Sequence, residues 1–84
     1  MLLLGSRPQN KTHYNASMDI VKRIGMNIKK IRTKKGWSQE ELSFVANLHR
    51  AYIGQIERGE KIIGVKNLEI IAKALDIDVT KLLK

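Results

Sequence analysis

Arg50, Ala51 and Gln55 stand close together in a short stretch whose apolar partners, Ile53 and Ile56, are spaced for one face of a helix. Ala51 and Gln55 are one helical turn apart, and Arg50 lies on the side opposite the isoleucines. A guanidinium can grip guanine O6 and N7, an amide can pair with adenine N6 and N7, and a small methyl side chain can pack on the thymine methyl group. Each also has an alternative interpretation: Arg50 as a solvated charge, Ala51 as a small residue that allows close approach, and Gln55 as a phosphate contact. The stretch predicts an exposed helical face suited to contact DNA bases.

The charge balance favours a polyanionic partner. The chain has 84 residues, with 16 Lys and Arg against 8 Asp and Glu, a net charge of +8 and a pI near 10.1. A single small domain of this charge is typical of proteins that bind nucleic acid or an anionic membrane surface. Hydrophobic residues make up 43% of the chain, which argues against wholesale disorder.

The sequence predicts no enzyme, cofactor, metal site or small-molecule ligand. It contains no cysteine, which excludes a disulfide framework, a thiolate zinc site and a cysteine nucleophile. Its two histidines, His13 and His49, are far apart and have no companion ligands. There is no Gly-rich phosphate loop and no pair of carboxylates with a plausible scaffold.

The first residues are expected to form an arm and not a targeting signal. Met1–Leu4 is apolar, but Gly5 and Pro8 interrupt the run long before the roughly 7–15 residues of a signal peptide or the roughly 20 of a membrane span. We therefore expect a cytoplasmic protein with no membrane contact. Residues 1–17 are predicted to be a flexible arm, either an unstructured leader or a basic arm in which Arg7 and Lys11 touch DNA. Residues 18–84 form the predicted domain.

Five helices are expected to position the exposed face. The first, 19–35, carries Ile20, Ile24, Ile28 and Ile31 at helical spacing, with Asp19 as its N-cap and Gly36 as its stop. It holds seven basic residues against one acidic residue. No useful stretch alternates with a period of two, so the prediction is an all-α domain.

The middle of the chain has the spacing of two short helices joined by a sharp turn. Ser38 and Glu41 form a capping box that begins a helix over 39–46, and Asn47 tolerates the left-handed conformation of a tight turn. The next helix covers 49–58 and ends at Gly59. Helices over 65–75 and 79–83 complete the platform, the last one preceded by a capping Asp78. This spacing is that of a helix-turn-helix.

The chain resembles the lambda-repressor-like, Cro-type (XRE) helix-turn-helix family over residues 19–83. The resemblance is carried by the segments Trp37–Leu42 and Asn47–Gly59 and by the later pattern Leu-x-x-Ile-Ala-Lys-Ala-Leu. Within that family, His49–Ile53 is most similar to controller proteins of restriction–modification systems. The resemblance implies a five-helix DNA-binding domain and a sequence-specific transcriptional regulator, expected as a homodimer on a pseudo-palindromic operator. Ala51 departs from the usual Thr and Gly54 from the usual Ser, so operator preference need not carry over.

The remaining site residues are expected to set position on the duplex. The resemblance gives Gln39 a phosphate contact, consistent with the affinity of helix N-termini for anions, and implies a structural, orienting ion pair between Arg32 and Glu57. The predicted phosphate-contacting set is Gln39, His49, Tyr52, Lys61 and Lys66. His49 has the alternative role of an imidazole helix cap, and the lysines that of solvated charges.

Apolar residues near the C-terminus suggest self-association. Together they present more apolar surface than one short helix can bury on its own domain. A homodimer interface is the more specific interpretation, and ordinary core is the simpler one. The residues are Ile70, Ile77, Val79, Leu82 and Leu83. The rival functions are an antitoxin-like protein-interaction module that also binds DNA, a prophage-type repressor, and a binder acting by charge alone.

Overall fold

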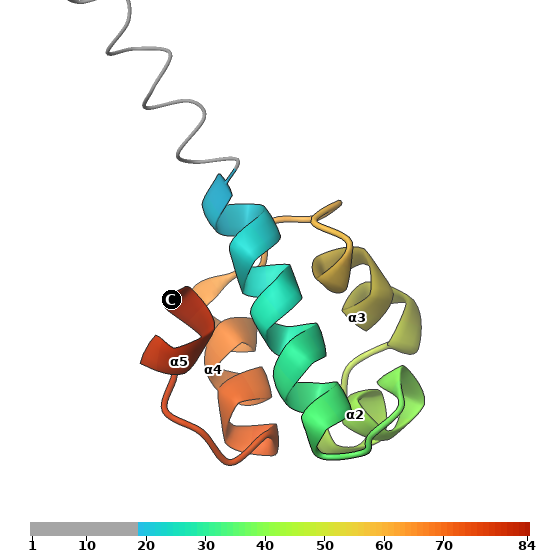
Figure 1. Ribbon diagram of the computed structural model, residues 1–84. Coiled ribbons are helices and arrows are strands. Elements are labelled where there is room, and N and C mark those ends of the chain that lie inside the picture. The colour runs from blue at the N-terminus through green and yellow to red at the C-terminus, as the bar shows by residue number, and fades with distance from the viewer. Residues whose placement is uncertain (1–18) are drawn as a thin grey trace, which may run out of the picture.

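The computed structural model describes residues 19–84, and this part of the chain contains five helices and no strand. The helices are residues 19–34, α2 (Gln39–Ala46), α3 (Arg50–Glu57), α4 (Val65–Ala74) and α5 (Thr80–Leu83). The first of them runs through the centre of the molecule, with α2 and α3 on one side and α4 and α5 on the other (Figure 1). The predicted all-α class and its five helices are confirmed. The prediction of a flexible arm over residues 1–17 lies outside the described residues.

Helix 19–34 follows its isoleucine spacing only in part. Ile24 and Ile28 are buried, and Ile31 packs against the core from its edge. Ile20 shares their helical spacing but is 37% exposed, so the spacing does not place it in the core. Asp19 is already helical and forms an i, i+4 pair with Arg23 at 3.9 Å, so it is not the N-cap. Gly36, with φ of 80°, ends this helix region as predicted.

The sharp turn between α2 and α3 rests on local chemistry. The Ser38 hydroxyl accepts from the Glu41 amide at 3.0 Å, and the Glu41 carboxylate accepts from the Ser38 amide at 2.8 Å. This is the reciprocal capping box that the sequence predicts. Asn47 adopts the left-handed conformation at φ 57° and ends α2. Both ends of α2 are therefore set by residues next to them in the chain.

The core gathers residues from every helix. α2 packs against both α3 and α4. The largest fully buried side chains are Ile28, Leu42, Ile53, Ile56, Ile71, Leu75 and Leu82. α5 is anchored by Leu82 and by the Asn27 side chain, which donates to the Leu82 carbonyl at 3.0 Å. The residues that α3 contributes to this core are Ile53 and Ile56.

Across residues 19–84 no helix combines the length and the apolar character required to cross a bilayer.

Candidate nucleic-acid interface

The first two residues of α3 are exposed, while the inner face of the helix is buried. Ile53 and Ile56 are 0% and 2% exposed and hold the helix to the core. Arg50 and Ala51, at its first turn, are exposed, and Gln55 is half-buried. The structure therefore places the three predicted base-contacting residues away from the isoleucine face, with Gln55 the least accessible of them.

His49 occupies the N-cap position of α3, but its imidazole makes no capping hydrogen bond. Its backbone is extended and its side chain is exposed. The alternative role as an imidazole cap is therefore wrong in this structure. The side chain remains free for the predicted phosphate contact.

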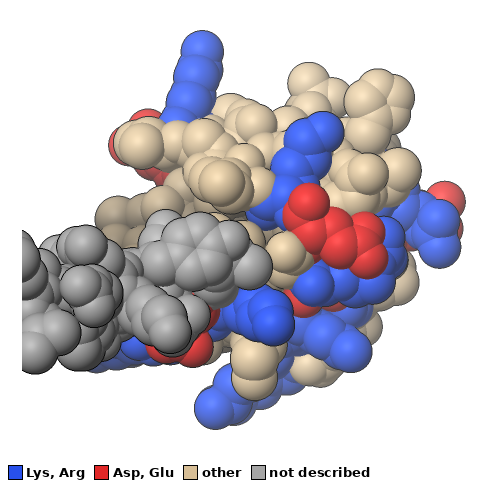
Figure 2. Space-filling view, turned by 90° about the horizontal axis from the view of Figure 1, so that it is seen from above, with Lys and Arg blue, Asp and Glu red and all other residues tan. Residues whose placement is uncertain are grey.

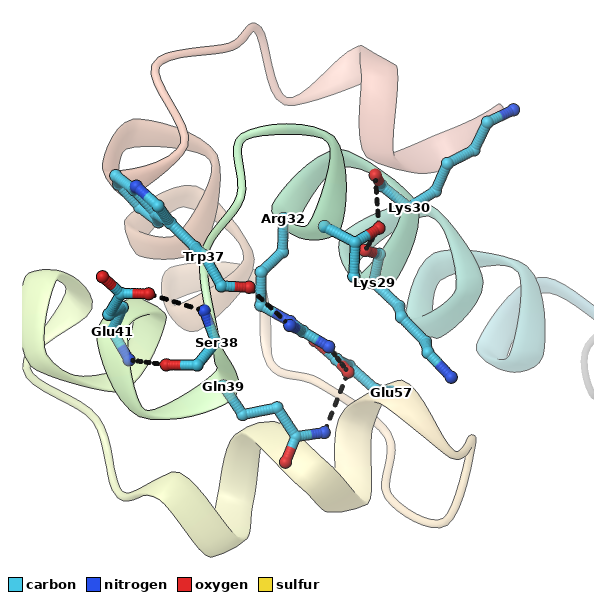
Figure 3. Close-up of polar contacts among 9 residues, drawn as sticks. Lys29, Lys30, Arg32, Trp37, Ser38, Gln39, Glu41 and Glu57 are labelled. Carbon is cyan, nitrogen blue, oxygen red and sulfur yellow. Dashed lines mark hydrogen bonds and ion pairs between the residues drawn. The ribbon is translucent and has the colours of Figure 1, made fainter.

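A buried ion pair joins the first helix to the end of α3. Arg32 Nε and Nη2 donate to the two Glu57 carboxylate oxygens at 2.6 and 2.8 Å, and Arg32 Nη1 donates to the Trp37 carbonyl at 2.7 Å (Figure 3). The two side chains are 7% and 2% exposed. The hydrogen bonds that Arg32 donates to the Glu57 carboxylate raise the pKa of Arg32 above its ordinary value. The predicted pair is present, and it also fixes the chain that leads into α2.

Gln39 reaches from the start of α2 to the same carboxylate. Its Nε2 donates to Glu57 Oε1 at 3.0 Å, and Figure 3 shows the side chain extended between the two helices. One of its two amide N–H groups is therefore committed to Glu57. The other, together with the backbone N–H groups of the α2 N-terminus, is what remains for a phosphate.

Three of the predicted phosphate-contacting residues, Tyr52, Lys61 and Lys66, are on α3, on the loop after it and on α4. The Tyr52 hydroxyl accepts from Asn67 Nδ2 at 3.0 Å, and the Lys61 ammonium lies 5.9 Å from the centre of the tyrosine ring. Lys66 is exposed on the first turn of α4, next to Asn67. No pattern in the sequence selects Asn67, because its role depends on the tertiary contact between α4 and Tyr52 of α3. Its bond fixes the phenol oxygen while leaving the phenol hydrogen free to donate to a phosphate.

Charge is unevenly spread over the surface. In the face drawn in Figure 2, Lys and Arg side chains crowd the lower part, while uncharged residues fill most of the upper part. The outer side of α2 is different again: Phe44 and Val45 are 84% and 50% exposed, and the acidic Glu40 and Glu41 lie in its first turn. A shallow hollow lies on either side of Phe44, one reaching Trp37 and the other His49.

The predicted dimer residues fall into three groups by burial. Leu82 is fully buried in the chain's own core, so its assignment to an interface between copies is wrong: α5 is so short that this side chain must anchor it. Ile70, Ile77 and Val79 are half-buried against the core. Leu83 is 40% exposed. The apolar surface available for a second copy is therefore smaller than predicted.

The structure has two short helices joined by a left-handed turn. The first turn of the second helix is exposed, and a buried ion pair ties the end of that helix to the first helix of the domain. This arrangement defines a helix-turn-helix domain of DNA-binding regulators. The helix-turn-helix family HTH_3 matches residues 28–82. The chain belongs to this family. The family assignment confirms the predicted fold and the predicted class, a DNA-binding transcription regulator.

The similar proteins include control proteins of restriction–modification systems. Control protein C.SmaI of Serratia marcescens is 42% identical over 66 residues, which cover 79% of this chain and 79% of the relative. The crystal structure of the restriction–modification controller protein C.AhdI from Aeromonas hydrophila is 42% identical, with a TM-score of 0.72, and the match covers 76% of this chain and 96% of that one. The controller protein C.Esp1396I, solved as a tetramer with its natural 35 base-pair operator, is 36% identical, with a TM-score of 0.68 over 77% of this chain and 96% of that one. The predicted resemblance to controller proteins is confirmed.

Proposed function

We propose that this protein is the controller of a restriction–modification system, a transcription regulator that binds a two-fold-related operator as a homodimer and carries out no catalysis. A cytoplasmic location belongs to the same proposal. The observation that carries it is the exposed first turn of α3, with Arg50 and Ala51 outward and Ile53 and Ile56 fixed in the core. The similarity to control proteins and to a controller solved on its operator supports it.

The proposal includes two kinds of contact with DNA. The first turn of α3 enters the major groove, whose width of about 12 Å admits one helix. The flanking phosphates are contacted by a second set of residues, which fixes the register of the helix on the duplex. This set is His49, Gln39, Tyr52, Lys61 and Lys66. Because each half-site is short, a second copy related by a two-fold axis about one helical turn away supplies the rest of the specificity.

Arg50→Ala tests the base contact. We expect affinity for a duplex selected in vitro from random sequences to fall by about 1–3 kcal/mol, with preference relaxed at one base position, because one bidentate guanine contact is lost. Fluorescence anisotropy against the selected duplex and its single-base variants measures both. Lys81→Ala, which removes an exposed cation on α5, is the matched control. A uniform loss on all duplexes would remove Arg50 from the base-contacting set.

Binding by the intact protein is expected to depend steeply on salt. With about 6–10 phosphate contacts per dimer, log affinity should fall with log salt at a slope of roughly −5 to −9. A binder acting by charge alone would share this slope but show equal affinity for all duplexes of the same length. Selection that returns no preferred sequence would therefore contradict the proposed function.

Leu83→Arg tests the homodimer. Leu83 is 40% exposed, so the fold should tolerate arginine there, whereas the buried Leu82 would not. We expect sedimentation at micromolar concentration to change from the mass of two chains to that of one, because a charge would be desolvated in the interface. Thermal unfolding of the variant checks that each copy stays folded. A dimer of unchanged stability would place the interface elsewhere.

The exposed face of α2 favours one alternative, an antitoxin-like module that binds a protein and also DNA. Phe44 is 84% exposed between two hollows, and large exposed aromatics often mark protein contacts. Phe44→Ser separates the two functions. Unchanged operator binding and unchanged regulation of a reporter gene in cells would leave no role for this face and disfavour the antitoxin.

A further inference from the structure

We infer that Arg58, a residue outside the predicted contact set, binds a DNA phosphate at the junction of α2 and α3, with Glu60 as the positioning residue that aims its guanidinium. The inference rests on the proposed function, since it concerns how the same surface holds DNA. It starts from Gly54, the residue of α3 that stands between Arg50 and Arg58 at four-residue spacing. These three positions form one row along the helix.

The space that a side chain would occupy at Gly54 is taken by Arg58. A Cβ built on Gly54 would lie 3.1 Å from Arg58 Nη1 and 3.6 Å from Gln39 Oε1. The Arg58 side chain therefore folds back from the end of α3 along the row that starts at Arg50. A side chain much larger than alanine at position 54 would displace it.

Glu60 determines which edge of the guanidinium is left free. Its carboxylate accepts from Arg58 Nε at 2.8 Å and from Nη2 at 3.0 Å. This hydrogen-bonded pair raises the pKa of Arg58 and lowers the pKa of Glu60. Two of the three guanidinium nitrogens are thus occupied, and the remaining one, Nη1, is the nitrogen that lies over Gly54. The two side chains are 58% and 53% exposed, so an incoming ligand can reach them.

The position of Nη1 matches a phosphate beside the groove. Nη1 and Gln39 Oε1 lie within 4 Å of one point, so Arg58 shares the place where the N-terminus of α2 meets α3. In helix-turn-helix complexes the first turn of the second helix reads bases, and the surrounding residues contact the backbone. The two N–H groups of Nη1, which Glu60 does not occupy, suit a phosphate oxygen at that place. Because the contact is to the backbone, it contributes to affinity on every sequence.

The experiment uses the full chain, the duplex selected for it and unrelated duplexes of the same length. Arg58→Ala should weaken binding about tenfold on all of them, the lower end for a hydrogen bond to a charged group, and reduce the salt slope by about one. Lys81→Ala is the control for loss of an exposed cation. A loss confined to one base position, or no loss beyond that of the control, would overturn the inference. Failure of the unaltered protein to prefer any duplex would instead contradict the proposed function.

Glu60→Ala separates positioning from simple repulsion of DNA. If Glu60 positions the guanidinium, Glu60→Ala weakens DNA binding by the otherwise unaltered chain about threefold, even though a negative charge is lost. In a chain that also carries Arg58→Ala, the same substitution strengthens DNA binding or leaves it unchanged. If Glu60 acts only as a repelling charge, its removal strengthens binding in both backgrounds and the positioning role is wrong. Unfolding midpoints of all variants are expected to stay together, because both side chains are exposed and such pairs contribute little to stability.

Discussion

Replacing Glu57 with alanine is expected to lower the free energy of unfolding by about 3–5 kcal/mol, a large share of what so small a domain has. The substitution leaves the Arg32 guanidinium buried, with its Nε and Nη2 hydrogen bonds gone. It also removes the acceptor of Gln39 Nε2. Urea unfolding followed by circular dichroism measures the loss.

Two further variants identify the origin of this effect. Glu60→Ala breaks an exposed pair of the same chemistry and is expected to leave the free energy of unfolding nearly unchanged. The double variant Arg32→Met with Glu57→Leu removes both charges and should recover much of the lost stability, since apolar replacements of buried ion pairs are often neutral or stabilising. A double variant as unstable as Glu57→Ala would show that packing and not charge accounts for the loss.

Gly25→Ala is expected to destabilise the domain by about 3 kcal/mol, the upper end of overpacking costs. A Cβ at this position would lie 2.2 Å from the Ile56 carbonyl oxygen and 2.9 Å from that of Glu57. Both are backbone atoms of the last turn of α3, so relief requires the two helices to move apart. In a solvent-exposed helix, Gly→Ala would instead stabilise the protein by roughly 0.5–1 kcal/mol. The sign of the stability change therefore shows whether the α3 backbone crowds position 25.

The control for Gly25 is Gly64→Ala. Gly64 has open space around its Cα and a φ of −74°, so alanine there should change stability by less than about 1 kcal/mol. Thermal unfolding of both variants gives the comparison. Equal stability of Gly25→Ala and the unaltered protein would mean that α3 can shift without cost, and that its orientation is not fixed at this crossing.

The local signals in the sequence predict the fold well. Capping at Ser38 and the left-handed turn at Asn47 are decided by neighbouring residues, and the structure places both where the pattern does. The extent of burial of Ile20 and Leu82 does not follow from these local signals, for one physical reason. Helical periodicity says which residues share a face, but which neighbour covers that face is decided by tertiary packing, and packing leaves Ile20 exposed while it buries Leu82.

The sequence predicts those residues of the candidate site whose exposure follows from the spacing of their own helix. The exposure of Arg50 and Ala51 follows from the spacing of the isoleucines beneath them. The roles of Gly25, Asn67 and Arg58 depend on which helix passes over which, and no run of neighbouring residues in the chain encodes those crossings. Glycine in particular gives no sign of whether its bare backbone is covered by a carbonyl, as at Gly25, or by a guanidinium, as at Gly54.

The bond between Arg32 and the Trp37 carbonyl has a practical consequence for studying this chain. Trp37 is its sole tryptophan, and the Lys35 ammonium lies 5.4 Å from the centre of the indole ring. Indole emission responds to nearby charge and to solvent access. The molecule therefore contains a native optical sensor at the joint between its first two helices, and loosening of that joint can be followed in solution without any attached dye.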